Sequence, residues 1–101
     1  MATNQSQWIE RRESPRHPAD GLVRLRQAGM LAPPFEGRLL DRGASGFRAR
    51  HDRLNMPSGQ VVEFEFSGSA GMARAVWTRI VNGEAETGFH ILAAASGARP
   101  I

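Results

Sequence analysis

Short runs in which apolar and polar residues alternate make up most of the chain. In the clearest run, Val62, Phe64 and Phe66 alternate with Glu63 and Glu65, which would place three apolar side chains on one face of a strand and two carboxylates in water. On this pattern we expect six strands, at residues 22–27, 35–40, 46–51, 60–66, 72–81 and 85–92.

Turn residues separate these runs at intervals of about 8–12 positions, a spacing typical of antiparallel sandwiches and barrels. Asn82-Gly83 is the strongest hairpin signal, because both residue types tolerate a positive φ. The pattern predicts an all-β fold, a six-stranded antiparallel β-barrel, with no helix longer than a turn or two.

The two ends of the chain lack this alternation. Residues 1–20 are predicted to be a flexible arm, in which Pro15 and Pro18 keep the segment from residue 11 onward out of a helix. Residues 93–101 are rich in small side chains and are expected to be a short tail or a helical turn. A chain of 101 residues has room for one small domain, which we assign to residues 21–92.

Composition narrows the class of protein. The chain has no cysteine, which excludes disulfides, thiol nucleophiles and thiolate metal sites. Its longest apolar stretches, such as residues 91–95, fall far short of the roughly 20 residues that span a bilayer, and residues 1–7 do not resemble a signal peptide. We therefore expect a soluble, cytoplasmic protein without a membrane partner.

Charge points to an anionic ligand. The net charge is +3 and all 13 basic residues are arginine, whose planar guanidinium pairs bidentately with phosphate or a guanine edge. A GC-rich genome would explain the arginine usage equally well. The distribution is more informative: residues 1–60 carry a net charge of +4 and residues 61–101 a net charge of −1, so an anion site should involve the first part.

No arrangement typical of an enzyme is present. His17, His51 and His90 have no metal-ligand spacing, and a lone histidine in a strand-rich domain is more often structural. Residues 43–47 superficially suggest a nucleophile elbow, but the second glycine comes one position too early. Without lysine, a phosphate-binding loop ending in Gly-Lys is impossible. We expect neither catalysis nor a metal or cofactor.

The arm carries the first candidate binding residues. Arg12 and Arg16, preceded by Arg11, are four residues apart in a segment that proline keeps extended. Their side chains would point the same way, about 13 Å apart along the backbone. Such a pair can grip a phosphate and the O6/N7 edge of a guanine. The plain alternative is a solvated run of charge.

A second candidate lies between two predicted strands, where Asp41, Gly43, Ser45 and Gly46 follow one another closely. A carboxylate there can accept hydrogen bonds from N1–H and N2–H of guanine, which arginine cannot do. Gly46 is expected to adopt a positive φ and let a ligand approach the backbone. The alternative is an ordinary bend with an Asx turn at Asp41.

Together these stretches resemble the PilZ domain family, which carries R-x-x-x-R before the first strand and [D/N]-x-S-x-x-G between the second and third. Arg12 and Arg16 match the first motif, Asp41 and Gly46 match the ends of the second, and residues 76–79 and 87–92 are similar to the last two strands of the family. The sequence departs from the family at Gly43, which stands in place of the serine.

The resemblance implies a six-stranded barrel that binds the bacterial second messenger cyclic di-GMP and passes the signal to a downstream protein partner, with the arginine arm folding over the ligand. The ligand-binding residues would be Arg11, Arg12, Arg16, Asp41, Gly43, Ser45 and Gly46.

Two alternatives remain open. The chain could be a degenerate PilZ-like adaptor that works by protein contact alone, or a small basic barrel that binds nucleic acid. The acidic second part and the lack of an aromatic stripe argue against a DNA or RNA partner. Among the aromatic residues, Phe64, Phe66 and Phe89 are expected in the core, and packing of Trp77 on the barrel is favoured over stacking on a base.

Overall fold

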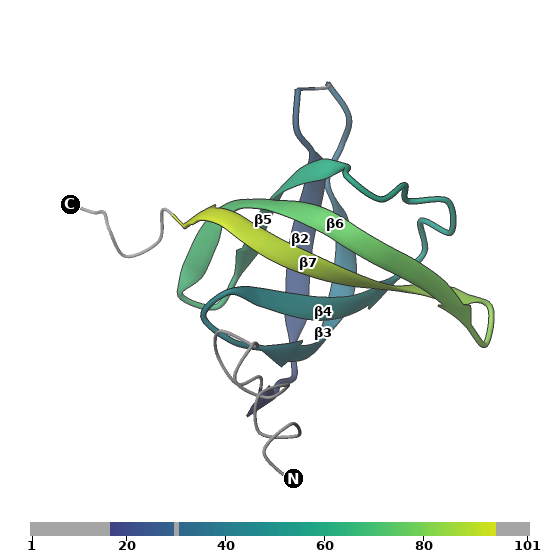
Figure 1. Cartoon of the computed structure of the whole chain (residues 1–101), viewed down its shortest axis with the longest axis horizontal. Helices are drawn as coiled ribbons and strands as arrows, with labels where there is room; N and C mark the ends of the chain where they lie inside the picture. The colour runs from purple at the N-terminus through teal and green to yellow at the C-terminus, as the bar shows by residue number, and fades with distance from the viewer. Residues whose placement is uncertain (1–16, 30, 95–101) are drawn as a thin grey trace, which may run out of the picture.

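The computed structural model describes residues 17–29 and 31–94, and all the regular elements in these ranges are strands (Figure 1). Six of the seven correspond to the predicted strands, two of them with the predicted ends and four with shifted ends. They are β1 (His17–Pro18), β2 (Leu22–Gln27), β3 (Phe35–Arg42), β4 (Gly46–His51), β5 (Val61–Phe66), β6 (Ser69–Val81) and β7 (Glu84–Ala94).

The strands β2 to β7 form a closed antiparallel barrel. Their order is β3-β2-β5-β6-β7-β4, and β3 also pairs with β4, so the sheet closes on itself. Closure gives each of the six strands a neighbour on both sides and removes the exposed edges of an open sheet. The predicted six-stranded antiparallel β-barrel is confirmed, and β1 is one extra strand beside it.

Strand β1 lies within residues 1–20, which the sequence predicts to be a flexible arm. His17 pairs with Arg42 and Pro18 pairs with Asp41 on β3, and the N–H of Ala19 donates to the carbonyl of Leu40 at 3.1 Å. The pairing of β2 with β3 stops at Arg38, so the rest of β3 offers a free edge on that side. A proline can join such an edge because its missing N–H is not needed on the outer side.

Two tight turns set the lengths of the long strands. Ser69 pairs with Phe66 directly across a two-residue turn in which Gly68 has a φ of +74°. Strand β6 therefore begins three residues before the prediction. At the other end of β6, Asn82 and Gly83 have φ values of 52° and 82°. The hairpin predicted at Asn82-Gly83 is confirmed.

Strand β7 also runs further than predicted, because it continues to pair with the early part of β6. Ala93 pairs with Met72 and Ala94 with Gly71, so these alanines are strand residues rather than the start of a tail. A Cβ on Gly71 would lie only 2.0 Å from the carbonyl oxygen of Ala93. Glycine is required there for the two strands to approach each other.

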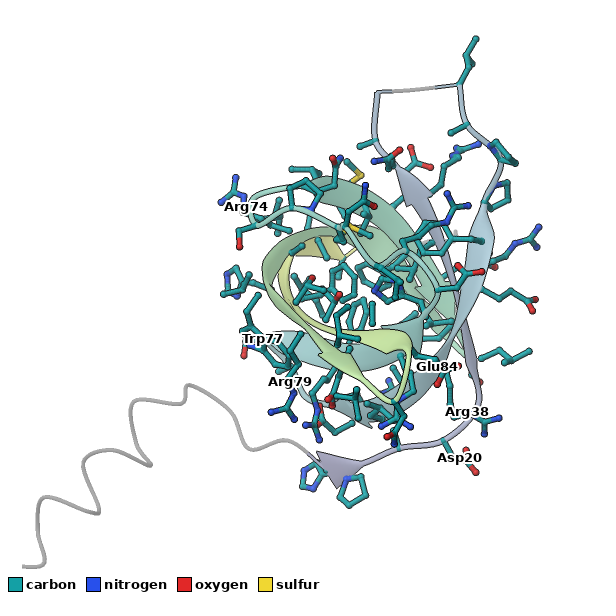
Figure 2. All side chains as sticks on the ribbon, turned by 90° about the vertical axis from the view of Figure 1, so that its right-hand side faces the viewer. Asp20, Arg38, Arg74, Trp77, Arg79 and Glu84 are labelled. Carbon is teal, nitrogen blue, oxygen red and sulfur yellow. The ribbon has the colours of Figure 1, made fainter. Side chains whose placement is uncertain are left out.

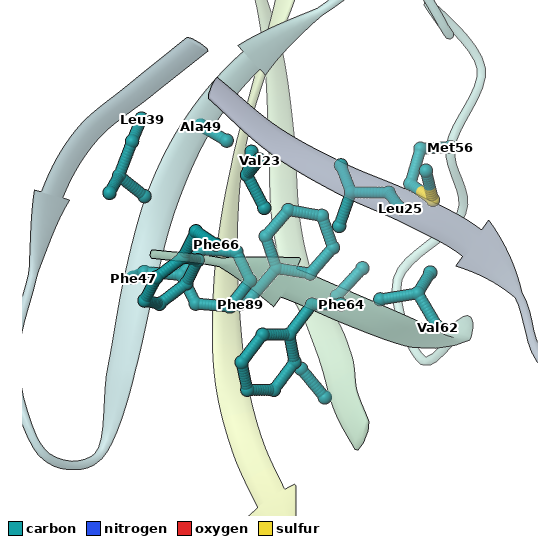
Figure 3. Close-up of a cluster of buried hydrophobic side chains, with 12 residues drawn as sticks. Val23, Leu25, Leu39, Phe47, Ala49, Met56, Val62, Phe64, Phe66 and Phe89 are labelled. Carbon is teal, nitrogen blue, oxygen red and sulfur yellow. The ribbon is translucent and has the colours of Figure 1, made fainter. Parts of the chain in front are cut away.

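Aromatic rings fill the interior of the barrel (Figure 3). The ring centroid of Phe47 lies 5.0 Å from that of Phe64, 5.1 Å from Phe66 and 4.9 Å from Phe89. The expected core positions of Phe64, Phe66 and Phe89 are confirmed. Aliphatic side chains complete the buried cluster, among them Val23, Leu25, Leu39, Met56 and Val62.

No helix in the described part of the chain is long and apolar enough to cross a membrane.

Candidate functional site

The 41–46 turn, at one end of the barrel, comprises the end of β3, the connection at residues 43–45 and the start of β4 (Figure 1). Asp41 is a residue of β3, Gly46 begins β4, and Gly43 and Ser45 lie between them. The N–H of Gly43 donates to the carbonyl of Gly46, and the N–H of Ile91 donates to the carbonyl of Ser45, both at 2.9 Å. The connection is therefore a tight turn fixed to β7.

One expectation about this turn is wrong. Gly46 is an ordinary strand residue that pairs with His90, and neither it nor Gly43 is among the described glycines with a positive φ. Asp41 pairs with Arg48 across β3 and β4. The antiparallel register continues to the edge of the turn, so extended backbone is sufficient there.

The other predicted ligand-binding residues, Arg11, Arg12 and Arg16, lie outside the described residues. The structure does describe the residue that follows Arg16, which is His17, and pairs it with Arg42 beside the 41–46 turn. The R-x-x-x-R sequence is therefore followed directly by a residue that pairs with β3 within the second candidate stretch.

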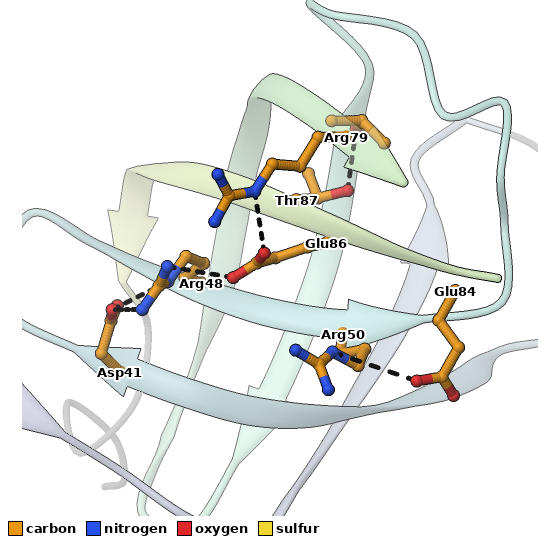
Figure 4. A network of polar contacts seen from close by, with 8 residues as sticks. Asp41, Arg48, Arg50, Arg79, Glu84, Glu86 and Thr87 are labelled. Carbon is orange, nitrogen blue, oxygen red and sulfur yellow. Dashed lines mark hydrogen bonds and ion pairs between the residues drawn. The ribbon is translucent and has the colours of Figure 1, made fainter. Parts of the chain in front are cut away.

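A row of side chains with alternating charge begins at this turn and extends across the outer surface of the barrel (Figure 4). Both Nε and Nη2 of Arg48 lie 2.9 Å from Oδ2 of Asp41. Nη1 of the same arginine lies 3.0 Å from Oε2 of Glu86, and Oε1 of Glu86 accepts from Nε of Arg79 at 2.9 Å. Four residues on β3, β4, β7 and β6 are therefore linked in one network.

Glu86 is the most enclosed member of this network, with a side chain that is only 4% exposed. A carboxylate so far removed from water is stabilised only when it is paired and hydrogen-bonded. Arg48 and Arg79 supply that pairing and remain 32% and 61% exposed. The network therefore presents guanidinium groups on an outer surface of the barrel.

Trp77 lies on the same outer surface as Arg79. An irregularity in the pairing of β6 and β7 between Ala75 and Trp77 leaves the indole on the outside, 37% exposed. The ring packs on Gly88, where a Cβ would come within 2.5 Å of Cε2 of the indole, and the guanidinium of Arg79 lies 5.6 Å from the ring. Packing of Trp77 on the barrel is confirmed, with part of its surface left accessible.

Arg42 adds a further cation at the turn. Its guanidinium carbon lies 4.7 Å above the ring of Phe66, and Nη2 lies 3.4 Å from Oγ of Ser69. Stacking on an aromatic ring fixes the plane of a guanidinium and leaves its donor edge available to a ligand.

Arg42, Arg48, Arg79 and Glu86 were not predicted from the sequence as members of a site. One pair could have been found, because Arg79 and Glu86 are symmetrically placed about the Asn82-Gly83 hairpin and pair directly across it. The contact of Arg48 with Glu86 could not, since it requires the register between β4 and β7, which are distant in the sequence.

One pair of side chains resembles a nucleophile and its base. Nε2 of His51 lies 2.7 Å from Oγ1 of Thr87, but Thr87 is fully buried and His51 is 4% exposed. A substrate cannot reach this hydroxyl, so the pair is structural. Within residues 17–29 and 31–94, no group of three or more histidine or acidic side chains is placed to hold a metal ion.

No protein-family model matches this chain, and no curated protein matches it either.

Proposed function

We propose that this chain is a receptor for cyclic di-GMP that resembles PilZ domains. The observation that carries the proposal is the pairing of His17 and Pro18 with Arg42 and Asp41. It joins the R-x-x-x-R segment to the barrel beside the stretch that contains Asp41 and Gly46. The residue that directly follows Arg16 is thereby held beside Asp41 and Arg42.

The ligand chemistry follows from the residue types. Arg12 and Arg16 would pair with phosphate oxygens and with the O6/N7 edge of guanine. Asp41 would accept from the N1–H and N2–H donors of the base. Arg42 and the exposed part of Trp77, which lie on the barrel itself, offer a cation and a flat surface on which a base can stack.

Binding would require a rearrangement of the charge network. Oδ2 of Asp41 already accepts two donors of Arg48, so a guanine that uses this oxygen must displace at least one of them. Arg48 is also paired with Glu86 and would keep that partner. The exchange of one charged contact for another lowers the net gain in affinity.

Signalling in this proposal is a change of surface rather than a reaction. The ligand would order the arm against the barrel, and the ordered arm would present or cover a face for a downstream protein. Because β1 is already paired with β3, ordering would begin from a fixed point.

A specific observation favours one second candidate, an adaptor that has lost the nucleotide. Gly43 lacks the hydroxyl of the family serine, and Asp41 is engaged by Arg48. Such a protein would keep the barrel and act through protein contacts alone.

Isothermal titration calorimetry with cyclic di-GMP distinguishes the receptor from the adaptor. The receptor should bind with a dissociation constant on the order of 0.1–50 μM, since a few charge-assisted contacts must also offset the ordering of the arm. GTP and a single-stranded RNA of similar charge are the controls and should bind far more weakly. Absence of saturation at several hundred micromolar cyclic di-GMP would leave the adaptor, and tighter binding of the RNA would favour the nucleic-acid barrel.

A further inference from the structure

A second candidate site lies at the end of the barrel opposite to the 41–46 turn, where the connection from β4 to β5 approaches the end of β2 and the start of β3 (Figure 1). A cavity of about 400 Å³ opens there, near the lower limit of the volumes usual for small-molecule sites. Its lining consists of Gln27, Phe35, Arg53, Asn55, Met56, Pro57 and Gln60.

The cation of this cavity, Arg53, is held at both its backbone and its side chain. Its N–H donates to Nδ1 of His51 at 3.0 Å, and its guanidinium carbon lies 4.4 Å above the ring of Phe35. Since Nδ1 accepts, Nε2 of His51 carries the proton and donates to Oγ1 of the buried Thr87. An arginine fixed in this way loses little conformational freedom when it pairs with an anion.

The remaining lining is polar but neutral, with an apolar part. Three carboxamides, those of Gln27, Asn55 and Gln60, can donate and accept hydrogen bonds. The amide of Gln60 is oriented by its bond to the carbonyl of Val61 at 2.9 Å. Met56, which is 6% exposed, gives the cavity an apolar surface.

Among the residues that the structure describes, no carboxylate is part of this lining. The nearest acid in contact with Arg53 is Asp52, whose oxygen lies 3.6 Å from Nε and whose side chain is 85% exposed. An ion pair so open to water contributes little and exchanges readily. The cavity is therefore complementary to negative charge.

We infer that this cavity binds a small organic anion with a flat or apolar body. The acidic group would pair with the guanidinium of Arg53, the body would lie against Met56 and Pro57, and polar substituents would bond to the carboxamides. The inference is independent of the cyclic di-GMP proposal, because none of the lining residues belongs to that site.

Nuclear magnetic resonance titration of the ¹⁵N-labelled full chain tests this inference with three probes. Salicylate has a flat ring, a carboxylate and a hydrogen-bonding hydroxyl, salicylamide is its neutral counterpart, and phenyl phosphate replaces the carboxylate by a phosphate. Salicylate should shift the amide signals of Arg53, Phe35 and Gln60 with a dissociation constant on the order of 1 mM, as its few atoms allow. Salicylamide should bind about tenfold more weakly. Of the two anions, salicylate and phenyl phosphate, the one that binds more tightly identifies the preferred acidic group.

Two variants test whether the charge of Arg53 is responsible for the binding of salicylate. Arg53→Gln should weaken salicylate about tenfold and leave salicylamide unchanged. Asn55→Asp, which adds a carboxylate to the exposed rim without a change of size, should weaken salicylate at least threefold. Arg38→Gln, an exposed arginine on β3 outside this lining, is the matched control and should bind like the parent.

Equal affinity for salicylate and salicylamide would overturn the inference. So would signal shifts confined to other parts of the barrel, an absence of saturation at about 20 mM salicylate, or Arg53→Gln and Asn55→Asp variants that are folded by circular dichroism and bind like the parent.

Discussion

Alternate residues of β4 and β7 face the inside and the outside of the barrel, and the two faces carry different kinds of side chain. Phe47 of β4 points into the aromatic core, while the next residue, Arg48, joins the outer charge network. On β7, Thr87 points inward and Glu86 outward. A one-residue step along either strand thus separates the groups that hold the fold from the groups that can meet a ligand. The side chains on the outer surface can be seen in Figure 2, where Trp77 and Arg79 are labelled.

The largest effect should come from the inside. Phe47→Ala removes the ring at the centre of the aromatic cluster and should lower the free energy of unfolding by about 3–5 kcal/mol, from lost burial and the cavity left behind. Urea denaturation followed by circular dichroism measures it. Leu54→Ala, at a half-exposed position, is the control and should change stability by less than about 1 kcal/mol. A similar loss in both variants would mean that the cluster is not the centre of stability.

Unlike the core, the predicted arm should affect binding but not the fold. Arg12→Ala and Arg16→Ala should each weaken cyclic di-GMP binding by about 2–4 kcal/mol, because ligand acceptors lose a charged partner. The melting temperature without ligand should hardly move, since both residues precede the barrel. Arg74→Ala, at an exposed position of β6, should bind normally. Unfolding of either arm variant, or unchanged affinity, would show that the site has been misplaced.

The charge network tests whether the outer surface also contributes to stability. Glu86→Gln removes a nearly buried charge that two arginines share, and the free energy of unfolding should fall by about 1–2 kcal/mol, discounted because both arginines are partly exposed. Glu84→Gln is the matched control on the same strand, where the carboxylate is 56% exposed and lies 3.9 Å from Arg50. Its effect should stay within about 0.5 kcal/mol. Equal denaturation midpoints for the two variants would show that the network is dispensable for folding.

A smaller effect is expected at the turn that bears the departure from the PilZ pattern. Gly43→Ser adds one neutral hydrogen-bonding group and should raise the affinity for cyclic di-GMP about three- to tenfold. Backbone strain does not oppose the change, because Gly43 has no positive φ. Ser45→Ala is measured beside it. A loss in Ser45→Ala without a gain in Gly43→Ser would mean that Ser45 already supplies the hydroxyl, and no change in either would remove the turn from the site.

The smallest effect should be a pH dependence from the inside of the barrel. Burial lowers the pKa of His51 below its ordinary value of 6.5, with a smaller contribution in the same direction from Arg53 and an opposing one from Asp52. The unfolded chain therefore binds the proton more tightly, so the stability that this group contributes is complete above about pH 6.5 and is lost as the pH falls below it.

Urea midpoints at pH 7.5 and pH 5.0 measure this loss. His51→Gln, which cannot titrate but keeps a donor for Thr87, should lose less stability between the two pH values than the parent. His90→Gln, at an exposed position on β7, should behave like the parent. Identical pH dependence in the parent and His51→Gln would exclude His51 as its source.

Much of the fold could be predicted from local sequence. The alternation of Val62, Phe64 and Phe66 with charged residues defined both a strand and its buried face, and Asn82-Gly83 defined a hairpin. The extra strand β1 could not be predicted, because its pairing depends on the free edge of β3 near Asp41. That edge exists because the pairing of β2 with β3 stops at Arg38, which the local sequence does not specify.

Less of the candidate site could be predicted, for the same physical reason. The sequence identified Asp41 and Gly46 as neighbours of a turn, and the structure places them there. It did not identify the contact between Arg48 and Glu86, because that contact depends on the register of β4 against β7, which are distant in the sequence. Local propensity does not specify such a register.

The contact between Trp77 and Gly88 restricts how this surface can change during evolution. With the indole in place, position 88 has no room even for a methyl group, so a mutation there is removed by selection unless the tryptophan has already been replaced by something smaller. Loss of the tryptophan, in turn, frees position 88 to drift. Positions 77 and 88 should therefore covary in descendants of this chain. Sequences that keep the tryptophan should keep the glycine, and sequences with a side chain at position 88 should lack the tryptophan and its flat outer surface.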